Sequence, residues 1–327
     1  MDNTLPFEKI KHEILVKKQA ETNPKYGCDP NNIPADQLIN YGIANINKPK
    51  GPTSHMVSEY VQKILKLDKA GHSGTLDPGV TGVLPVALGK ATRIVQTLLN
   101  AGKEYICMMK IHKQLPEEEV RKTINTFIGK IKQLPPVRSA VVRQIRERTI
   151  YYLDIIEINQ LDVLFKVGCQ AGTYIRKLCH DIGLKLETRA HMAELIRTKA
   201  GPFNFDTTVT LQDLEDAIWY CKNEKNDKLL RHCIQPIENA VQHIPKIWIQ
   251  DSAVDSICHG AHLNAPGIAK LDSDIEKETE IAIMTLKNEL VALANAKKTT
   301  KEILDAEKGL AATAFKVFMQ PGTYSKE

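Results

Sequence analysis

Apolar side chains recur at two different spacings over the first 240 residues. Spacings of three and four residues, which place side chains on one helix face, predict helices over 54–65, 94–99, 116–128, 173–182 and 211–222. Short runs rich in β-branched and aromatic residues predict strands over 105–111, 149–158 and 161–167. Because helices and strands interleave in this way, the sequence predicts an α+β fold.

The pattern changes between residues 235 and 247, where two prolines bracket a domain boundary. Beyond it, we expect a short helix over 251–259 and then closely spaced strands, including 280–286 and 290–294. Short strands with frequent turns predict a small barrel. Residues 1–45 are polar and interrupted by prolines, so they predict an extended arm.

Length and composition limit the number of domains, the cellular compartment and the state of the cysteines. A chain of 327 residues can form two domains that each bury a core. No apolar run reaches the roughly 20 residues that span a bilayer, and the first residues lack the apolar core of a secretory signal. We therefore expect a cytoplasmic or nuclear protein. Seven cysteines without any CxxC pair predict free thiols, with no disulfide and no metal centre.

The net charge of +5 is mild, but its distribution is uneven. Residues 121–150 hold eight Lys or Arg and one acid, an excess of seven positive charges. Such a patch suits a phosphate backbone, although the same pattern also occurs on solvated surfaces.

The segment 71–93, GHSGTLDPGVTGVLPVALGKATR, places Asp77 among glycines and prolines and next to an apolar run. Glycine permits unusual backbone angles and Pro78 fixes its own φ, so the loop can hold one carboxylate in place. From these residues alone, an ordinary Asp-Pro turn remains an alternative.

This segment resembles the catalytic motif of the TruB and dyskerin family of RNA pseudouridine synthases. Further similar stretches follow in the family's order: INKPKGPTSHMV, KEYI, QLPPVRSAVVRQIRERTIYY, GCQAGTYIRKLCHDIG and AHMAELIRTKAGPF. The segment from about Trp248 to Tyr324 resembles the PUA RNA-binding module of the archaeal H/ACA subunit. The resemblance covers roughly residues 35–325.

The resemblance implies a catalytic domain over 46–240, built on a mixed, largely antiparallel sheet with flanking helices. It implies a small β-rich PUA pseudo-barrel over 245–327. Residues 1–45 are then expected to wrap the PUA domain.

The implied reaction breaks the N1–C1′ bond of a uridine and rejoins the base through C5, without redox change, so no cofactor is expected. A carboxylate adds to C6 of the base or to C1′ of the ribose, and the sequence leaves both open. By the matching motifs, Asp77 is this nucleophile and Arg176 is its ion-pair partner. Tyr105 matches the tyrosine that stacks on the target base and takes part in a proton transfer.

Other matched residues are expected to contact RNA. His72 fits the side chain that fills the space left by a flipped base, and Leu195 fits the uracil pocket. Lys48 is expected either to support the site or to contact phosphate. The candidate phosphate-binding arginines are Arg138, Arg143, Arg146 and Arg148. Four positions depart from the family pattern and bring RNA affinity and guide docking into question: Gly79, Val142, Gln144 and Ile196.

The leading functional hypothesis is the catalytic subunit of an H/ACA complex that modifies ribosomal RNA. The implied partners are a guide RNA, a small Nop-type protein, a Gar-type protein and a kink-turn-binding ribosomal-type protein. A chain ending at Glu327 without a lysine-rich tail favours the archaeal form over the eukaryotic nucleolar one. Two alternatives stay open: a stand-alone synthase for the TΨC loop of transfer RNA, and a non-catalytic RNA-binding scaffold.

Overall fold

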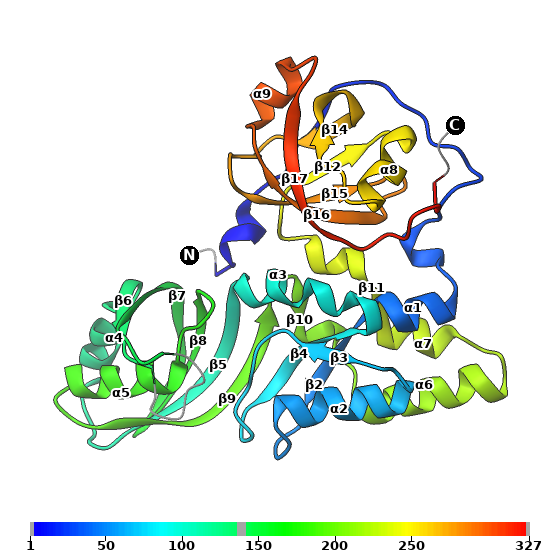
Figure 1. Cartoon of the computed structure of the whole chain (residues 1–327). Helices are drawn as coiled ribbons and strands as arrows, with labels where there is room; N and C mark the ends of the chain where they lie inside the picture. The colour runs from blue at the N-terminus through cyan, green and yellow to red at the C-terminus, as the bar shows by residue number, and fades with distance from the viewer. Residues whose placement is uncertain (1–2, 136–141, 325–327) are drawn as a thin grey trace.

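The computed structural model describes residues 3–135 and 142–324, which form two β-sheets with flanking helices (Figure 1). The larger sheet has the order β11-β2-β4-β9-β5-β8-β7-β6, with β3 also paired to β4 and β10 to β9. Its strands are β2 (Gly42–Lys48), β3 (Ala70–His72), β4 (Thr81–Leu88), β5 (Lys103–Ile111), β6 (Gly129–Gln133), β7 (Arg146–Asn159), β8 (Asp162–Cys169), β9 (Ala190–Ala200), β10 (Phe203–Asn204) and β11 (Ile234–Pro236). Its β4–β9 pair is parallel and the other pairs are antiparallel, so the predicted mixed, largely antiparallel sheet is confirmed.

The smaller sheet has the order β1-β14-β12-β15-β16-β17-β13. Its strands are β1 (Ile14–Val16), β12 (Lys246–Ile249), β13 (Leu263–Asn264), β14 (Ile268–Asp272), β15 (Glu280–Met284), β16 (Leu290–Ala296) and β17 (Leu310–Val317). β15 and β16 are joined by a turn in which Asn288 has a φ of 68°, a left-handed conformation that Asn adopts more readily than most residues. This sheet carries α8 (Asp251–Cys258) and α9 (Thr300–Asp305).

Two groups of helices pack against the larger sheet, one towards each end (Figure 1). One group buries apolar side chains against β2 and β4, and the other against β5, β7, β8 and β9. The first group is α1 (Ala35–Tyr41), α2 (Ser54–Leu65), α6 (Leu211–Asn223) and α7 (Lys228–Cys233), and the second is α4 (Glu117–Asn125) and α5 (Ile175–Lys185). Among the described residues, no helix is long and apolar enough to cross a membrane.

The two sheets share one apolar core. A short helix, α3 (Val95–Asn100), lies between them, and its Leu98 belongs to the same buried cluster as Phe203 and Leu293. The cluster also contains Ile237 and Val241, from the segment that joins the two parts. Because this connection is buried, it fixes the PUA-like part against the larger sheet and does not act as a loose linker.

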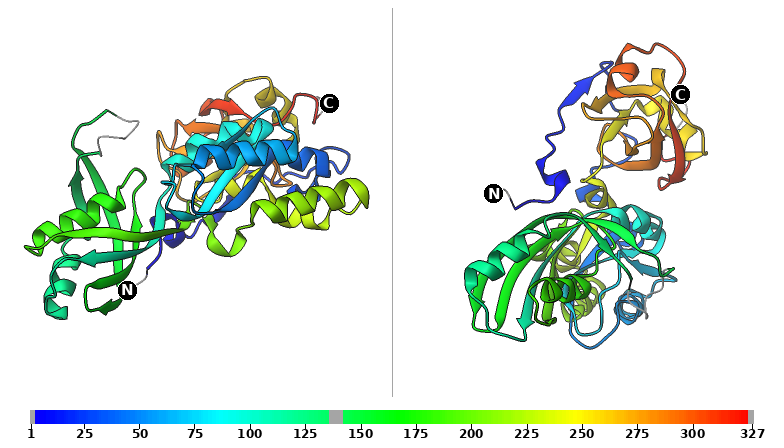
Figure 2. Two further views of the ribbon diagram at one scale, coloured as in Figure 1. Left: turned by 90° about the horizontal axis from the view of Figure 1, so that it is seen from below. Right: turned by 90° about the vertical axis from the view of Figure 1, so that its left-hand side faces the viewer.

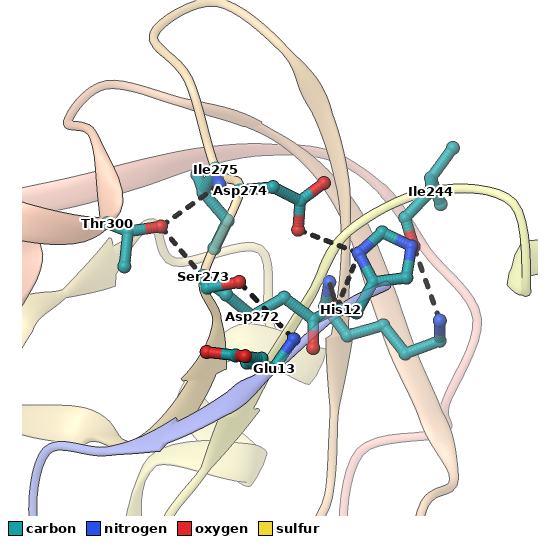
Figure 3. Close-up of polar contacts among 9 residues, drawn as sticks. His12, Glu13, Ile244, Asp272, Ser273, Asp274, Ile275 and Thr300 are labelled. Carbon is teal, nitrogen blue, oxygen red and sulfur yellow. Dashed lines mark hydrogen bonds and ion pairs between the residues drawn. The ribbon is translucent and has the colours of Figure 1, made fainter. Parts of the chain in front are cut away.

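The N-terminal segment runs along the smaller sheet (Figure 2). β1 pairs antiparallel with β14 and becomes an edge strand of that sheet. Nearby, Nδ1 of His12 lies 2.7 Å from Oδ1 of Asp274 and 3.8 Å from Oδ2 of Asp272, whose Oδ2 also accepts the backbone N–H of Lys246 (Figure 3). Lys17 Nζ donates to three carbonyl oxygens at the end of α9. These contacts hold the arm to the C-terminal part of the chain.

Not every expectation from the pattern agrees with the structure. α1 and the first residues of β2 fall inside the range 1–45 that we assigned to the arm, yet β2 belongs to the larger sheet. α4 ends at Asn125, so Ile128 lies beyond the helix and is exposed, and Gly129 begins β6. The strand β9 was not predicted at all.

Candidate active site

Asp77 lies on the loop between β3 and β4, and the loop is fixed from both sides. Leu76 and Val80 are buried, so the residues that flank Asp77 anchor the loop in the core. Ser54 Oγ, at the start of α2, accepts the backbone N–H of Leu76 at 2.8 Å and donates to its carbonyl oxygen at 3.2 Å. Asp77 itself points outward, with 52% of its side chain exposed. The loop therefore presents one carboxylate at the surface.

Lys48, the last residue of β2, lies fully buried beneath this loop. Its Nζ donates to the carbonyl oxygens of Pro49 at 3.0 Å, Pro78 at 3.3 Å and Val80 at 2.9 Å. Burial lowers the pKa of Lys48, and the negative charge of Asp77 partly opposes this shift. Of the two roles that the sequence left open for Lys48, this geometry supports the one in which it holds the loop.

Replacing Lys48 by Met removes the charged donor of the Pro49 and Val80 carbonyl oxygens, while the Pro78 oxygen still accepts the backbone N–H of Gly51. We expect the free energy of unfolding to fall by about 2–4 kcal/mol, because buried acceptors lose their partner. We also expect turnover to fall roughly 10–100-fold, because Asp77 is less precisely placed. Urea unfolding and single-turnover assays measure the two effects, with Lys50→Met on the exposed neighbour as control. A Lys48→Met protein with wild-type turnover would contradict a loop-holding role.

Arg176 lies in the first turn of α5, and its Nη2 forms an ion pair with Oδ2 of Asp77. The start of α5 is fixed by Gln133 of β6, whose side chain accepts the backbone N–H of Tyr174 at 3.0 Å and donates to its carbonyl oxygen at 3.1 Å. Gln133 is buried and was not identified from the sequence. The hydrogen bonds between Gln133 and Tyr174 fix the start of α5 and thereby the position of Arg176 relative to Asp77.

The Asp77–Arg176 pair is half-exposed, with 59% of the Arg176 side chain accessible. The described residues leave both side chains of the pair open to solvent. Because both side chains are accessible, a large substrate can bind over them and exclude water. An ion pair of this exposure contributes little to folding, so its geometry matters for placing the carboxylate.

Tyr105 and Leu195 lie on the neighbouring central strands β5 and β9. Tyr105 is partly exposed and packs against an apolar cluster that includes Leu195 and Leu76. Burial raises the pKa of Tyr105; the positive charge of Arg197 opposes this, and the charge of Asp77 adds to it. The charge of Asp77 thus affects Tyr105, and the Tyr105 side chain packs on buried apolar residues.

His72 is the last residue of β3, whereas we had placed it in the loop. Its Nδ1 is buried and forms no hydrogen bond within residues 3–135 and 142–324. Burial lowers the pKa of His72, and the positive charges of Arg197 and His55 lower it further. Its insertion into RNA stays a prediction.

The basic stretch of residues 121–150 includes β6 and the start of β7. Arg146 and Arg148 lie on β7, Arg143 is exposed just before it, and Arg138 lies outside the described residues. The guanidinium of Arg148 packs over Gly172, where a Cβ would come within 3.1 Å of it. Gly172 has a φ of 78°, so it also supplies a backbone conformation that few other residues adopt. Arg148 therefore lies next to the 172–176 segment.

The four departures from the family pattern are all at the surface. Val142, Gln144 and Ile196 are exposed, and a Cβ at Gly79 would meet no atom within 4 Å. These departures therefore change positions that are accessible to solvent and to binding partners.

One group of side chains among the described residues has the spacing of metal ligands: His12, Asp272 and Asp274, whose ligand atoms lie within 4.8 Å of one another. They belong to the contact between the arm and the smaller sheet (Figure 3), whereas Asp77 lies on the loop between β3 and β4 of the larger sheet. His12 and Asp274 share a hydrogen bond, and Oδ2 of Asp272 accepts the backbone N–H of Lys246.

Four family models match the chain in succession. They are DKCLD over residues 2–58, the N-terminal domain of TruB family pseudouridylate synthases over 62–118 and 110–175, the tRNA pseudouridylate synthase B C-terminal domain over 176–242 and the PUA domain over 245–317.

Curated relatives match over nearly the whole chain. A probable tRNA pseudouridine synthase B of Methanopyrus kandleri is 52% identical over 325 residues, which are 99% of this chain and 96% of the relative. A protein described in the same words from Methanosarcina barkeri is 55% identical over 314 residues, which are 96% and 93% of the two chains.

Solved structures match equally completely. A chain in a crystal structure of a Cbf5-Nop10-Gar1 complex superposes with a TM-score of 0.95 at 51% identity, covering 99% of both chains. A chain in a structure of an H/ACA RNP bound to a substrate RNA containing 2′-deoxyuridine gives a TM-score of 0.93 at 49% identity, again over 99% of both.

Proposed function

Because the chain belongs to the TruB family of pseudouridine synthases, we propose that it converts uridine to pseudouridine in ribosomal RNA at positions selected by an H/ACA guide RNA. Two neighbours that superpose over 99% of their length come from a Cbf5-Nop10-Gar1 complex and from a substrate-bound H/ACA RNP. This full-length agreement, including the PUA part, is the observation that carries the proposal.

In the proposed mechanism, the Asp77 carboxylate is the nucleophile and Arg176 orients it. The N1–C1′ bond breaks, the base turns, and a C5–C1′ bond forms. N1 gains a proton and C5 loses one, so the net reaction is an isomerisation. The half-exposed Asp77–Arg176 pair supports this assignment, since an extruded base can cover it while stacking on Tyr105. Leu195 belongs to the buried apolar cluster against which Tyr105 packs, and we propose that it contacts the base.

The proposed assembly includes a guide RNA, Nop10-type and Gar1-type proteins and a kink-turn-binding ribosomal-type protein. The PUA part, fixed against the catalytic sheet by their shared apolar core, holds one part of the guide at a set distance from Asp77. Arg143, Arg146 and Arg148 are proposed to contact phosphates beside the site.

A second candidate substrate is the TΨC loop of transfer RNA, because the curated relatives are described as probable tRNA pseudouridine synthases. This candidate keeps the same chemistry and removes the guide. A non-catalytic scaffold is disfavoured, because the Asp77–Arg176 contact is intact.

Tritium release from C5-labelled uridine separates these functions. We expect release from a ribosomal RNA fragment only with a complementary guide and the partner proteins, and not with a guide whose pairing segments are scrambled. Release from transfer RNA without guide, and none from the guided substrate, would replace the first candidate by the second. No release under any condition would exclude both.

A further inference from the structure

Arg197 is a buried cation in the middle of the larger sheet, directly beside the candidate site. It lies on β9, only 1% exposed, and is among the largest fully buried side chains of the protein. Its backbone is paired with Gly82 on β4 and with Tyr105 on β5, so it connects the strand that follows the Asp77 loop to the strand that carries Tyr105. A Cβ at Gly82 would lie 2.2 Å from the Arg197 carbonyl oxygen, so glycine permits this close approach.

The guanidinium of Arg197 donates two hydrogen bonds. Its Nε donates to the carbonyl oxygen of Val83 at 2.7 Å, and Nη2 donates to that of Gly74 at 3.2 Å. Tyr105 is the cross-strand partner of Arg197 on β5, so the two side chains are neighbours on one face of the sheet. Gly74 belongs to the loop that carries Asp77, so one side chain holds the loop and lies beside the tyrosine.

Arg197 lacks the acidic partner that a buried cation usually has. Among the residues that the structure describes, no ion pair includes it, and Tyr105 is the one group that opposes the lowering of its pKa by burial. Burying an unpaired charge is costly unless its donors are satisfied. Here two carbonyl oxygens accept from the guanidinium, and its cross-strand neighbour is Tyr105 of the candidate site.

We propose that Arg197 is a positioning residue for the reaction, which fixes the hydroxyl of Tyr105 relative to the loop that carries Asp77. This inference rests on the function proposed above for those two residues. A guanidinium can only donate hydrogen bonds, so it can hold the Tyr105 oxygen only as an acceptor and leaves the phenolic proton to point elsewhere.

A double-mutant cycle in the assembled complex tests this role. Wild type, Arg197→Lys, Tyr105→Phe and the double variant are compared by tritium release from the guided substrate. We expect Arg197→Lys to lower kcat about 100-fold while KM for the substrate RNA changes by less than about threefold. In the Tyr105→Phe background, the same change should lower kcat by less than about threefold, because its effect is transmitted through the hydroxyl.

A change to a buried charge can also reduce the folded fraction. The concentration of folded complex is therefore determined by titration with guide RNA, and rates are expressed per folded complex. Arg197→Gln is measured as a second variant. The matched control is Lys103→Met. Lys103 is a buried cation on the same strand as Tyr105, and its Nζ donates to three carbonyl oxygens at the end of α3. We expect Lys103→Met to lose stability and to retain kcat within about threefold.

The possible outcomes separate this inference from the proposed function. If wild type releases tritium only with guide and intact Asp77, the function stands. Equal effects of Arg197→Lys in both Tyr105 backgrounds, or a loss confined to KM, would then overturn the positioning role. If wild type itself is inactive on the guided substrate, the proposed function fails instead.

Discussion

Asp77→Asn is expected to lower tritium release from the guided substrate by at least about 10⁴-fold, because an amide cannot add to C6 or C1′ as a carboxylate does. Asn has nearly the same shape, so the loop should keep its conformation. Leu76 and Val80 still anchor the loop, and the Lys48 contacts are to backbone oxygens. The free energy of unfolding should therefore change by less than about 1 kcal/mol.

The matched control is Asp68→Asn, because Asp68 is an exposed acid just before β3. It removes the same charge close to the loop, and we expect activity and guide binding to stay at the wild-type level. Equal turnover of wild type and Asp77→Asn would show that Asp77 is not the nucleophile, whatever the substrate.

Arg176→Ala is expected to produce the second-largest loss, roughly 10²–10⁴-fold in kcat. The substitution removes the group that orients the Asp77 carboxylate, and it leaves the loop itself in place. Because more than half of the Arg176 side chain is exposed, stability should hardly change. Filter binding of guide and substrate RNA should stay within about threefold of wild type.

Two companion variants make the Arg176 result specific. Arg176→Lys keeps the charge without the planar fork, so its activity should fall between wild type and Arg176→Ala. Lys177→Ala breaks a neighbouring ion pair with Asp181 on the same helix and should leave turnover unchanged. Weakened RNA binding with normal turnover of the bound RNA would assign Arg176 to binding instead.

Helices with strong local signals were predictable from the sequence. The helix α2 begins after Thr53, whose hydroxyl accepts the backbone N–H of Met56, and its apolar side chains recur every three or four residues. β9 could not be predicted in the same way. Its pairing with β5 shifts register twice, between Glu104 and Tyr105 and between Met108 and Met109, so the alternation of buried and exposed side chains is interrupted.

The candidate site was only partly predictable. The resemblance identified Asp77 and Arg176, which the structure brings into contact across 99 positions of the chain. It did not reveal Gln133 or Arg197, because their importance depends on partners 41 and 123 positions away. A charged residue between apolar neighbours on a central strand is a signal that can identify such residues, but only once the strand itself is known.

The pairing of β1 with β14 has a consequence for how the protein is made. During synthesis, residues 14–16 leave the ribosome long before residues 268–272 exist, and the His12–Asp274 contact joins positions 262 apart. Until its partner arrives, the segment is an unpaired strand with exposed Ile14 and Val16, which other nascent chains can bind. Closing so long a loop is slow, so the arm is expected to be among the last parts to fold. Bulky fusions placed before residue 14 should therefore slow maturation more than fusions on surface loops of the larger sheet.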